Sequence, residues 1–269
     1  MSRITRRLAL VTILTMLGPA AAVAAAKTLI SLSGSTSIYP LATALARSYA
    51  GPHGVGFRIF QGGSDIGIND VAHGRVTIGD SSRDPIPGVD PHGLYWYKIA
   101  RDGVCVITNN SNPVGNLSQQ EVQAIFDGSV SNWGQVPGAS AHGAIDLITR
   151  TSASGTADAF QQIFMGQNLK ISGRAVEKQS NGLVQQTVNA DSNAIGFVSL
   201  DFTTGVHPVP YQGVACTLRN SKSGQYIGVR NFWMITRGRA SGAAGQFIHW
   251  VQTSTTARNI VNTHWIPLH

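Results

Sequence analysis

Turns rich in serine, threonine and glycine recur along this chain, and each directly follows a short apolar segment with the character of a strand. The segment 28–32 runs into the turn 33–37, and the segment 57–60 runs into the turn 61–64; a helical pattern of apolar residues follows each turn. Strands and helices that alternate through short turns indicate an α/β fold with mostly parallel sheets. In such a fold, ligands bind at the carboxyl ends of strands, where the N-termini of helices point.

The turn 150–156 carries the pattern furthest, because an arginine opens it and a glycine lies at the start of the next helix. Unpaired backbone N–H groups and the positive end of the helix dipole favour an anion at such a helix start. Gly155 leaves room for an oxyanion, and Ser154 and Thr156 add hydroxyl donors. Arg150 offers a guanidinium group that pairs with two oxygens at once. Taken alone, these residues also fit an ordinary helix cap beside a surface arginine.

Several such turns in one chain together predict a cradle for an oxyanion. Four turns leave strands with serine, threonine, glycine or arginine, and none of the four contains a lysine: 33–37, 62–64, 81–83 and 150–156. The turn 178–182 heads a further helix and is a weaker candidate. A site with one or two arginines and many neutral donors holds a multiply charged anion mainly by hydrogen bonds.

The first 26 residues have the pattern of a secretory signal peptide. Arg3, Arg6 and Arg7 precede an apolar run from about Leu8 to Leu17, and small residues ending in three alanines follow. The alternative is an uncleaved anchor helix, but the run is short for a membrane span and the small residues suit a signal peptidase. We therefore expect cleavage near Ala26 and a mature protein that is soluble in the periplasm or secreted.

The charge of the chain argues against a nucleic-acid partner. The net charge is +7, and it falls to about +4 without the three arginines of the signal peptide. No dense block of lysine and arginine remains, so nucleic acid is not expected to bind.

Cysteine and histidine give no sign of a metal site or a cofactor. Cys105 and Cys216 are the only cysteines, and both lie in apolar, strand-like segments. In an exported protein they either pair in a disulfide or remain as buried thiols. The eight histidines are scattered without a metal-binding motif, so we expect neither metal nor cofactor.

In combination, the ordered motifs of this chain resemble the periplasmic phosphate-binding proteins of phosphate ABC transporters. The resemblance runs from about residue 29 to residue 267 and rests on the segments 34–40, 61–64, 81–83, 102–104, 112–114, 126–128, 132–133, 150–156 and 194–198. It implies an α/β fold of the type II solute-binding class, with two lobes that close on orthophosphate. Each lobe is expected to be a mixed, mostly parallel sheet flanked by helices.

The resemblance also implies a division of the chain and a set of ligands. Lobe 1 is expected to comprise 27–108 and 203–269, and lobe 2 to comprise 109–202, with the ligand cleft between them. The polar stretch 109–113 interrupts the strand pattern and is expected to cross between the lobes. The phosphate ligands are expected among Ser35, Thr36, Ser37, Ile38, Ser64, Ser82, Arg83, Arg150, Ser154, Gly155 and Thr156.

One position departs from the family pattern. Many members have an aspartate in the third turn that accepts a proton from phosphate, whereas this chain has Ser82, followed by Arg83. A carboxylate there disfavours sulfate, which has no proton to donate near neutral pH, so its absence weakens the preference for phosphate. Asp80 or Asp84 is a possible replacement if either side chain turns inward. Arg83 is expected to contribute less than Arg150.

The function expected from these observations is capture of inorganic phosphate by closure of two lobes, followed by delivery to a membrane permease. A monomer is expected. Alternatives are a binding protein for sulfate or arsenate, a phosphate sensor, a phosphatase, or a structural or adhesive protein. A phosphatase is disfavoured because the chain has no G-x-S-x-G or H-E-x-x-H motif, no Walker A sequence and no visible general base.

Overall fold

The computed structural model describes residues 28–268, so the predicted signal peptide lies outside the described residues. None of the helices in 28–268 combines the length and the apolar character needed to span a bilayer. The strands are β1 (Thr28–Gly34), β2 (Val55–Gln61), β3 (Ile78–Ser81), β4 (Leu94–Thr108), β5 (Asp146–Arg150), β6 (Val176–Lys178), β7 (Ala194–Ser199), β8 (His207–Pro208) and β9 (Val229–Arg237).

The helices follow the strands in alternation over most of the chain. The α-helices are α1 (Tyr39–His53), α2 (Ser64–Ala72), α3 (Gln119–Asp127), α4 (Gly155–Phe160), α5 (Asn181–Ala190), α6 (Leu218–Ser223), α7 (Gly242–Thr253) and α8 (Thr255–His264). Three short turns complete the set: the 3₁₀ turns η1 (Trp133–Gln135) and η3 (Leu200–Phe202), and the π-helical turn η2 (Gln161–Met165) that continues α4.

The strands form one continuous ladder in the order β2-β1-β3-β9-β4-β7-β5-β6, with β8 paired to β4. Parallel pairing joins β1 to β2 and β3, and β5 to β6 and β7. Antiparallel pairing joins β9 to β3 and β4, and β4 to β7 and β8. The predicted mixed α/β class is confirmed.

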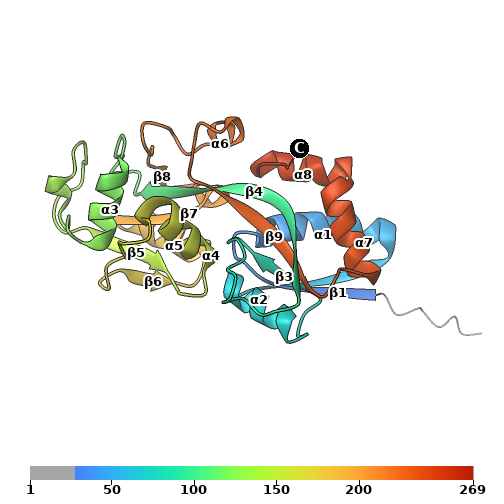
Figure 1. Cartoon of the computed structure of the whole chain (residues 1–269). Helices are drawn as coiled ribbons and strands as arrows, with labels where there is room; N and C mark the ends of the chain where they lie inside the picture. Colours follow the sequence, from blue (N-terminus) through green and yellow to red (C-terminus); the bar gives the residue numbers. More distant parts are fainter. Residues whose placement is uncertain (1–27, 269) are drawn as a thin grey trace, which may run out of the picture.

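Two separate hydrophobic cores divide the molecule into two lobes (Figure 1). In lobe 1, α1, α7 and α8 pack on one face of the sheet, and α2 covers the other through a small satellite cluster around Ile68 and Val71. In lobe 2, α3, α4 and α5 enclose a core rich in aromatic rings. The long strands β4 and β9 run between the two lobes, as Figure 1 shows.

The chain crosses between lobes inside β4, and not at 109–113 as the sequence suggested. β4 pairs with β9 as far as Gly103 and with β7 from Val104 onward. The polar stretch 109–113 belongs to lobe 2, because its side chains form hydrogen bonds with backbone groups of lobe 2. Asn109 Nδ2 donates to the carbonyl of Val188, and Asn112 Oδ1 accepts the N–H of Ser140.

The packing also differs from the expected boundary at residue 203. Residues of the segment 206–226 join the lobe 2 core, among them Val209 and Tyr211. Two links hold this segment there: a disulfide joins Cys105 to Cys216, and the Tyr226 hydroxyl donates to the carbonyl of Val104 at 2.6 Å. The sequence had left the state of the two cysteines open.

Candidate anion-binding site between the lobes

The first three serine-rich turns meet because β1 and β3 are neighbours and α2 packs closely over both. The N–H of Ser35 donates to the carbonyl of Asp80 at 3.0 Å, which ties the turn after β1 to the end of β3. Gly67 in α2 lies so close to the carbonyl of Ser33 that a side chain there would clash. The turns after β1, β2 and β3 are therefore held at one edge of lobe 1.

A chain of buried hydroxyls links these turns to one another. Ser35 Oγ donates to Ser82 Oγ at 2.8 Å, and Ser82 Oγ lies 3.3 Å from Ser64 Oγ. The N–H of Ser82 donates to Ser64 Oγ at 3.0 Å. All three side chains are buried, so the polar groups are withdrawn from solvent and must satisfy one another or a ligand.

The turn that begins α4 brings the donors of lobe 2 against this edge. Ser37 Oγ lies 3.0 Å from Thr156 Oγ1, and the N–H of Asp65 donates to the carbonyl of Ala153 at 3.2 Å. Ser154 caps α4 by accepting the N–H groups of Thr156 and Ala157. We call Ser35, Thr36, Ser37, Ser64, Ser82, Arg150, Ser154, Gly155 and Thr156 the interlobe cluster.

Gly155 is the point of closest approach within the interlobe cluster. A Cβ atom at this position would lie 2.9 Å from Ser82 Oγ and 3.0 Å from the backbone nitrogen of Arg83, and closer still to Ser64 Oγ. These three neighbours all belong to lobe 1, whereas Gly155 belongs to lobe 2. The close contact of the lobes therefore depends on the missing side chain.

Arg150 is a buried cation without a carboxylate partner among the described residues. Its Nε and Nη2 atoms donate to the carbonyls of Lys178 and Gln179, and Nη2 also donates to Thr36 Oγ1 at 3.2 Å. Its Nη1 atom is buried and has no partner in residues 28–268. Burial, together with the charge of Arg230, lowers the pKa of Arg150 to about 9. An anion bound at Nη1 would supply the missing hydrogen bond and the missing charge.

The sequence analysis missed Arg230, which reaches the interlobe cluster from β9. Its guanidinium group pairs with the carboxylate of Asp102 on β4 at 2.8 Å. It also donates to Ser37 Oγ at 2.8 Å and to Thr156 Oγ1 at 2.9 Å, so it contacts both lobes. Burial lowers the pKa of Arg230 and raises that of Asp102, and the attraction between the two charges opposes both shifts. The signal available in the sequence was one charged residue, Asp102 or Arg230, inside each of two apolar segments. The structure pairs these two positions across β4 and β9.

Asn181 at the start of α5 was also missed, although the turn 178–182 was noted as a weaker candidate. Its Nδ2 atom donates to Thr36 Oγ1 and to Ser37 Oγ, both at 2.9 Å. Its Oδ1 atom accepts the N–H of Ser199 at 3.0 Å. The side chain is fully buried and bridges lobe 2 to the first turn of lobe 1.

Two of the predicted ligands have side chains elsewhere. The guanidinium group of Arg83 pairs with Asp90 at 2.6 Å and with Asp65 at 2.9 Å, and lies 3.4 Å from Asp158. Burial lowers the pKa of Arg83, but the carboxylates of Asp90 and Asp65 outweigh it and raise the pKa above its ordinary value. The side chain of Ile38 packs in the lobe 1 core, and its N–H closes the first turn on the carbonyl of Ser35.

Among the described residues, neither of the two aspartates considered as replacements for the missing carboxylate forms a side-chain hydrogen bond with the interlobe cluster. Asp84 Oδ1 accepts hydrogen bonds from Asn231 and Trp233. Asp80 is buried, which raises the pKa of its carboxyl group well above the ordinary value, and its Oδ1 atom has no partner among the described residues.

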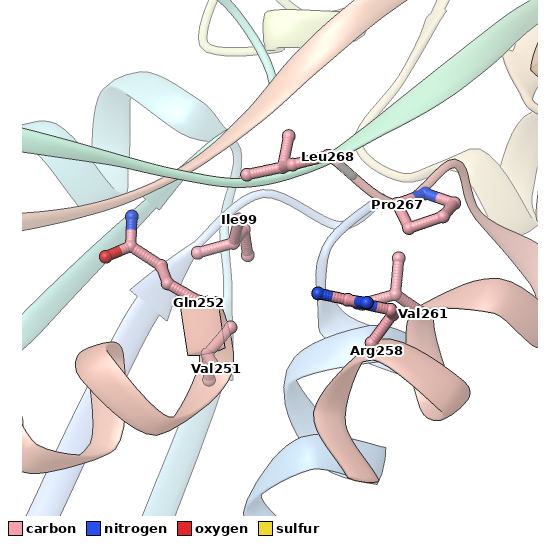
Figure 2. Close-up of a pocket in the computed structure, with 7 residues that line it drawn as sticks. All are labelled: Ile99, Val251, Gln252, Arg258, Val261, Pro267 and Leu268. Carbon is pink, nitrogen blue, oxygen red and sulfur yellow. The ribbon is translucent and has the colours of Figure 1, made fainter. Parts of the chain in front are cut away.

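A pocket elsewhere on the molecule is not part of this site. Figure 2 shows it between β4, α7, α8 and the C-terminal residues, where Val251 and Val261 lie on its wall. None of its lining residues belongs to the interlobe cluster. Within 28–268, no group of histidine, cysteine, aspartate and glutamate side chains is arranged to hold a metal ion.

Comparison with known proteins places the chain among solute-binding proteins. Residues 19–255 match a family described as the PBP superfamily domain. The phosphate-binding protein PstS of Bacillus subtilis is 25% identical over 245 residues, which cover 89% of this chain and 80% of that protein.

Two of the solved structures that resemble this chain match it over most of its length. A Clostridium perfringens structure, described as a phosphate ABC transporter substrate-binding protein with bound phosphate, is 30% identical, with a TM-score of 0.83. The match covers 90% of this chain and all of the other. An ABC-type phosphate transport receptor from Vibrio cholerae is 26% identical, with a TM-score of 0.71 and coverage of 88% and 99%.

Proposed function

This chain belongs to the PBP superfamily, and we propose that it captures inorganic phosphate between its two lobes and delivers it to an ABC transporter. The observation that carries the proposal is the buried Nη1 atom of Arg150, which has neither a hydrogen-bond acceptor nor a carboxylate partner within residues 28–268. The names of the relatives from Bacillus subtilis, Clostridium perfringens and Vibrio cholerae support phosphate as the anion.

Both lobes supply donors to the proposed ligand. Ser37, Ser64 and Ser82 come from lobe 1, and Arg150, Ser154 and Thr156 come from lobe 2. A tetrahedral oxyanion has four oxygens, so it can accept hydrogen bonds from both sides at the same time. Because all of these bonds form only when the lobes are together, the anion stabilises the closed arrangement.

The two strands that join the lobes supply the hinge for this closure. β4 crosses between Gly103 and Val104, and the chain returns to lobe 1 as it enters β9 at Val229. Only these two connections are needed for one lobe to rotate against the other. The ion pair of Asp102 with Arg230 lies on these same strands, so the hinge and the anion site share residues.

We also propose an extracytoplasmic location, a monomeric state and a membrane permease as partner. The signal peptide expected at 1–26 and the disulfide between Cys105 and Cys216 support export, because disulfides persist in oxidising compartments. Binding without catalysis is proposed for the site.

Calorimetric titration of the purified mature protein with phosphate tests the function, with arsenate and sulfate titrated in parallel. We expect saturable binding of phosphate at one site per chain. The proposal is wrong if none of the three anions binds. A phosphatase assay with a chromogenic phosphate ester checks the alternative activity. If the protein hydrolysed the ester and Arg150→Ala abolished the hydrolysis, the site would be catalytic and the proposal of binding alone would be wrong.

A further inference from the structure

We propose that Asp102 accepts a proton from the bound anion through its Oδ1 atom, and that this contact makes the interlobe cluster select phosphate over sulfate. The inference rests on the proposed anion-binding function and concerns its selectivity. In the sequence, Asp80 and Asp84 were the aspartates considered for this role.

The two oxygens of the Asp102 carboxylate have different surroundings. Oδ2 accepts three hydrogen bonds, from Arg230 Nε at 3.1 Å, from Arg230 Nη2 at 2.8 Å and from Ser199 Oγ at 2.9 Å. Oδ1 is buried and has no partner within residues 28–268. A buried polar atom without a partner is costly, so Oδ1 is an acceptor that a ligand with a proton can satisfy.

Arg230 holds this carboxylate next to the interlobe cluster. Its Nη2 atom donates at 2.8 Å both to Asp102 Oδ2 and to Ser37 Oγ, so one nitrogen atom bridges the carboxylate and the first turn of the site. Asp102 also lies immediately before the point at which β4 crosses between the lobes, and Ser199 contacts it from lobe 2. The carboxylate therefore lies where the two lobes meet.

Two other carboxylate oxygens within 28–268 are buried without a hydrogen-bond partner, but neither is connected to the interlobe cluster in this way. Asp80 Oδ1 belongs to a side chain that forms no hydrogen bond with the cluster. Asp158 Oδ2 lies 3.4 Å from Arg83 Nε, outside the cluster, and its side chain is partly exposed. Asp102 is therefore the best placed of the three to meet a bound anion.

Arg150 and Asp102 together define the ligand that completes the site. Among the described residues, Arg150 Nη1 lacks an acceptor and Asp102 Oδ1 lacks a donor. Phosphate near neutral pH has bare oxygens for the first and at least one O–H for the second. Sulfate has only bare oxygens, so its lone pairs would face those of Oδ1.

Ser35 offers a second acceptor, but a hydroxyl does not discriminate between the two anions in the same way. Its Oγ atom donates to Ser82 Oγ at 2.8 Å and accepts the N–H of Ser37 at 3.2 Å, which leaves one lone pair free. A hydroxyl can rotate and donate when the ligand has no proton, whereas an ionised carboxylate only accepts. Rejection of sulfate is therefore assigned to Asp102.

The surroundings of Asp102 favour the ionised form that this role requires. Burial raises the pKa of its carboxyl group, but the charge and hydrogen bonds of Arg230 and the hydroxyl of Ser199 act in the opposite direction. Three donors on Oδ2 stabilise the charged carboxylate, because hydrogen bonds to an ionised acceptor are stronger than those to a neutral one.

Four anions tested on the wild-type protein separate the ligand proton from the size of the ligand. Phosphate and arsenate keep an O–H near neutral pH, whereas sulfate and selenate, their counterparts in size, keep none. Competition against labelled phosphate gives the four affinities. We expect sulfate and selenate to bind at least about a hundredfold more weakly than phosphate and arsenate.

Each result of this competition decides between the inference and the proposed function. Sulfate that competes as well as phosphate overturns the inference and leaves the proposed function intact. If arsenate and selenate are both rejected because of their size, the affinities of phosphate and sulfate decide. If none of the four anions binds, the proposed function fails and the inference fails with it.

Asp102→Asn tests the assignment to this residue. Because Arg230 and Ser199 still need an acceptor, the amide oxygen takes the place of Oδ2 and the amide nitrogen takes the place of Oδ1. The variant then has a donor where the wild type has an acceptor. We expect the ratio of sulfate affinity to phosphate affinity to rise by at least about tenfold. An unchanged ratio, with binding retained, overturns the inference.

The double variant Asp102→Asn/Arg230→Gln keeps the test decisive if the single variant does not fold, because it removes both charges of the buried ion pair together. The same rise in the ratio is expected. Ser35→Ala removes the other free acceptor and should keep the wild-type ratio even if both anions bind more weakly. Loss of discrimination in Ser35→Ala would show that Asp102 is not the residue that selects.

Asp201→Asn is the matched control for the change in charge. Asp201 is near enough to raise the pKa of Asp102, but its carboxylate pairs with His264 at 2.9 Å. The variant thus removes a negative charge near the site and leaves the free oxygen of Asp102 in place. Its ratio of sulfate to phosphate affinity should equal that of the wild type. A rise as large as in Asp102→Asn would mean that local charge sets the selectivity and that the inference is wrong.

Discussion

The two buried arginines of the candidate site differ in what neutralises them, and we expect this difference to separate a ligand-binding role from a structural one. Arg230 has the carboxylate of Asp102 as its partner, whereas the acceptors of Arg150 among the described residues are all neutral. We expect Arg150→Met to weaken phosphate binding by about 1.5 to 3 kcal/mol, which is roughly tenfold to 150-fold. The free protein should be as stable as the wild type or more so, because the variant removes an unpaired buried charge. Calorimetric titration and chemical unfolding without phosphate measure the two effects.

Arg230→Met is the counterpart and should behave differently. It leaves the carboxylate of Asp102 buried without its cation, and removal of one partner of a buried ion pair costs about 3 to 5 kcal/mol. Chemical unfolding of this variant without phosphate should therefore show a large loss of stability. Equal destabilisation in Arg150→Met would contradict the distinction between the two arginines.

At the residue scale, the sequence predicted the groups that lie in turns and missed those that lie in regular structure. Ser64, Ser154 and Gly155 were recognisable because hydroxyl or glycine residues at a helix start have a local physical meaning. Arg230 and Asn181 enter the site through contacts between distant segments, which no local pattern encodes. Arg83 was placed in the site because it follows Ser82, but three carboxylates that the sequence does not reveal as neighbours hold its side chain.

At the element scale, the first residue of α4, Gly155, allows this helix to approach lobe 1 closely. A side chain at position 155 would overlap Ser64 Oγ of the other lobe. We expect Gly155→Ala to reduce phosphate affinity by at least about a hundredfold, because closure is needed for the full set of hydrogen bonds. Unfolding of the free protein should change little, since an opened arrangement relieves the clash.

Gly182→Ala is the matched control for this prediction. Gly182 also lies in the first turn of a helix, but a Cβ atom there meets only Ser180 Oγ at 3.9 Å, an ordinary contact. Its phosphate affinity should stay within a few-fold of the wild type. Similar losses in both variants, measured by calorimetric titration, would point to helix disruption in place of a block on closure.

Asp158 in the first turn of α4 is a carboxylate that should make the stability of the protein depend on pH. Burial and the charges of Asp65 and Asp90 raise the pKa of Asp158 to about 6, although Arg83 acts in the opposite direction. A raised pKa means that the stabilising contribution is full below the ordinary value and is lost as the pH rises through about 6. Because 32% of the Asp158 side chain is exposed, solvent screening limits the loss to about 1 kcal/mol.

Asp158→Asn should therefore be more stable than the wild type at about pH 8, by about 1 kcal/mol, and equal to it at about pH 4. Chemical unfolding across this range checks the sign. Glu177→Gln, which removes an exposed carboxylate from β6, should leave the dependence on pH unchanged. A wild-type protein whose stability rises between about pH 5 and about pH 7 relative to Asp158→Asn would reverse the assignment.

Helices and strands could be predicted where the local sequence pattern is long or distinctive. The prediction failed where tertiary packing decides the boundaries of an element. α3 is predictable from local sequence, because Ser118 and Glu121 have the spacing of a capping box and the structure forms that box. The apolar segments 94–99 and 103–108 are separated by the polar residues Arg101 and Asp102, yet they form one strand, β4, because pairing with β9 continues through an irregularity between Lys98 and Ala100. The three-residue strand β6 and the six-residue helix α6 have too few residues to carry a periodic signal.

At the scale of the whole molecule, residues 28–268 form two lobes because they build two separate hydrophobic cores, and the strands β4 and β9 run between them. The α/β class could be predicted from alternation of strands and helices. The lobe boundary could not, because the segment 206–226 lies late in the chain and yet returns to lobe 2 through contacts with Val104 and Cys105. The return depends on contacts between segments that are far apart in the sequence, so local composition does not predict it.

The disulfide between Cys105 and Cys216 links the segment 206–226 covalently to β4. Its removal tests the assignment of this segment to lobe 2. Cys105 and Cys216 are 111 residues apart and both lie in the lobe 2 core, so the bond closes a long loop within one lobe. Loss of a native disulfide of this kind typically costs about 2 to 5 kcal/mol. We expect the double variant Cys105→Ser/Cys216→Ser to unfold at lower temperature than the wild type, and reductant to lower the wild-type transition toward that of the variant.

Phosphate affinity should change by no more than a few-fold in the folded double variant, because both cysteines belong to the lobe 2 core and the bond joins residues of one lobe. The double variant also serves as the control for reductant, because its unfolding temperature should not change when reductant is added. If the variant instead bound phosphate much more weakly while its unfolding temperature stayed at the wild-type value, the disulfide would be acting on the arrangement of the lobes. Residues 206–226 would then have to be assigned to the hinge instead of the lobe 2 core.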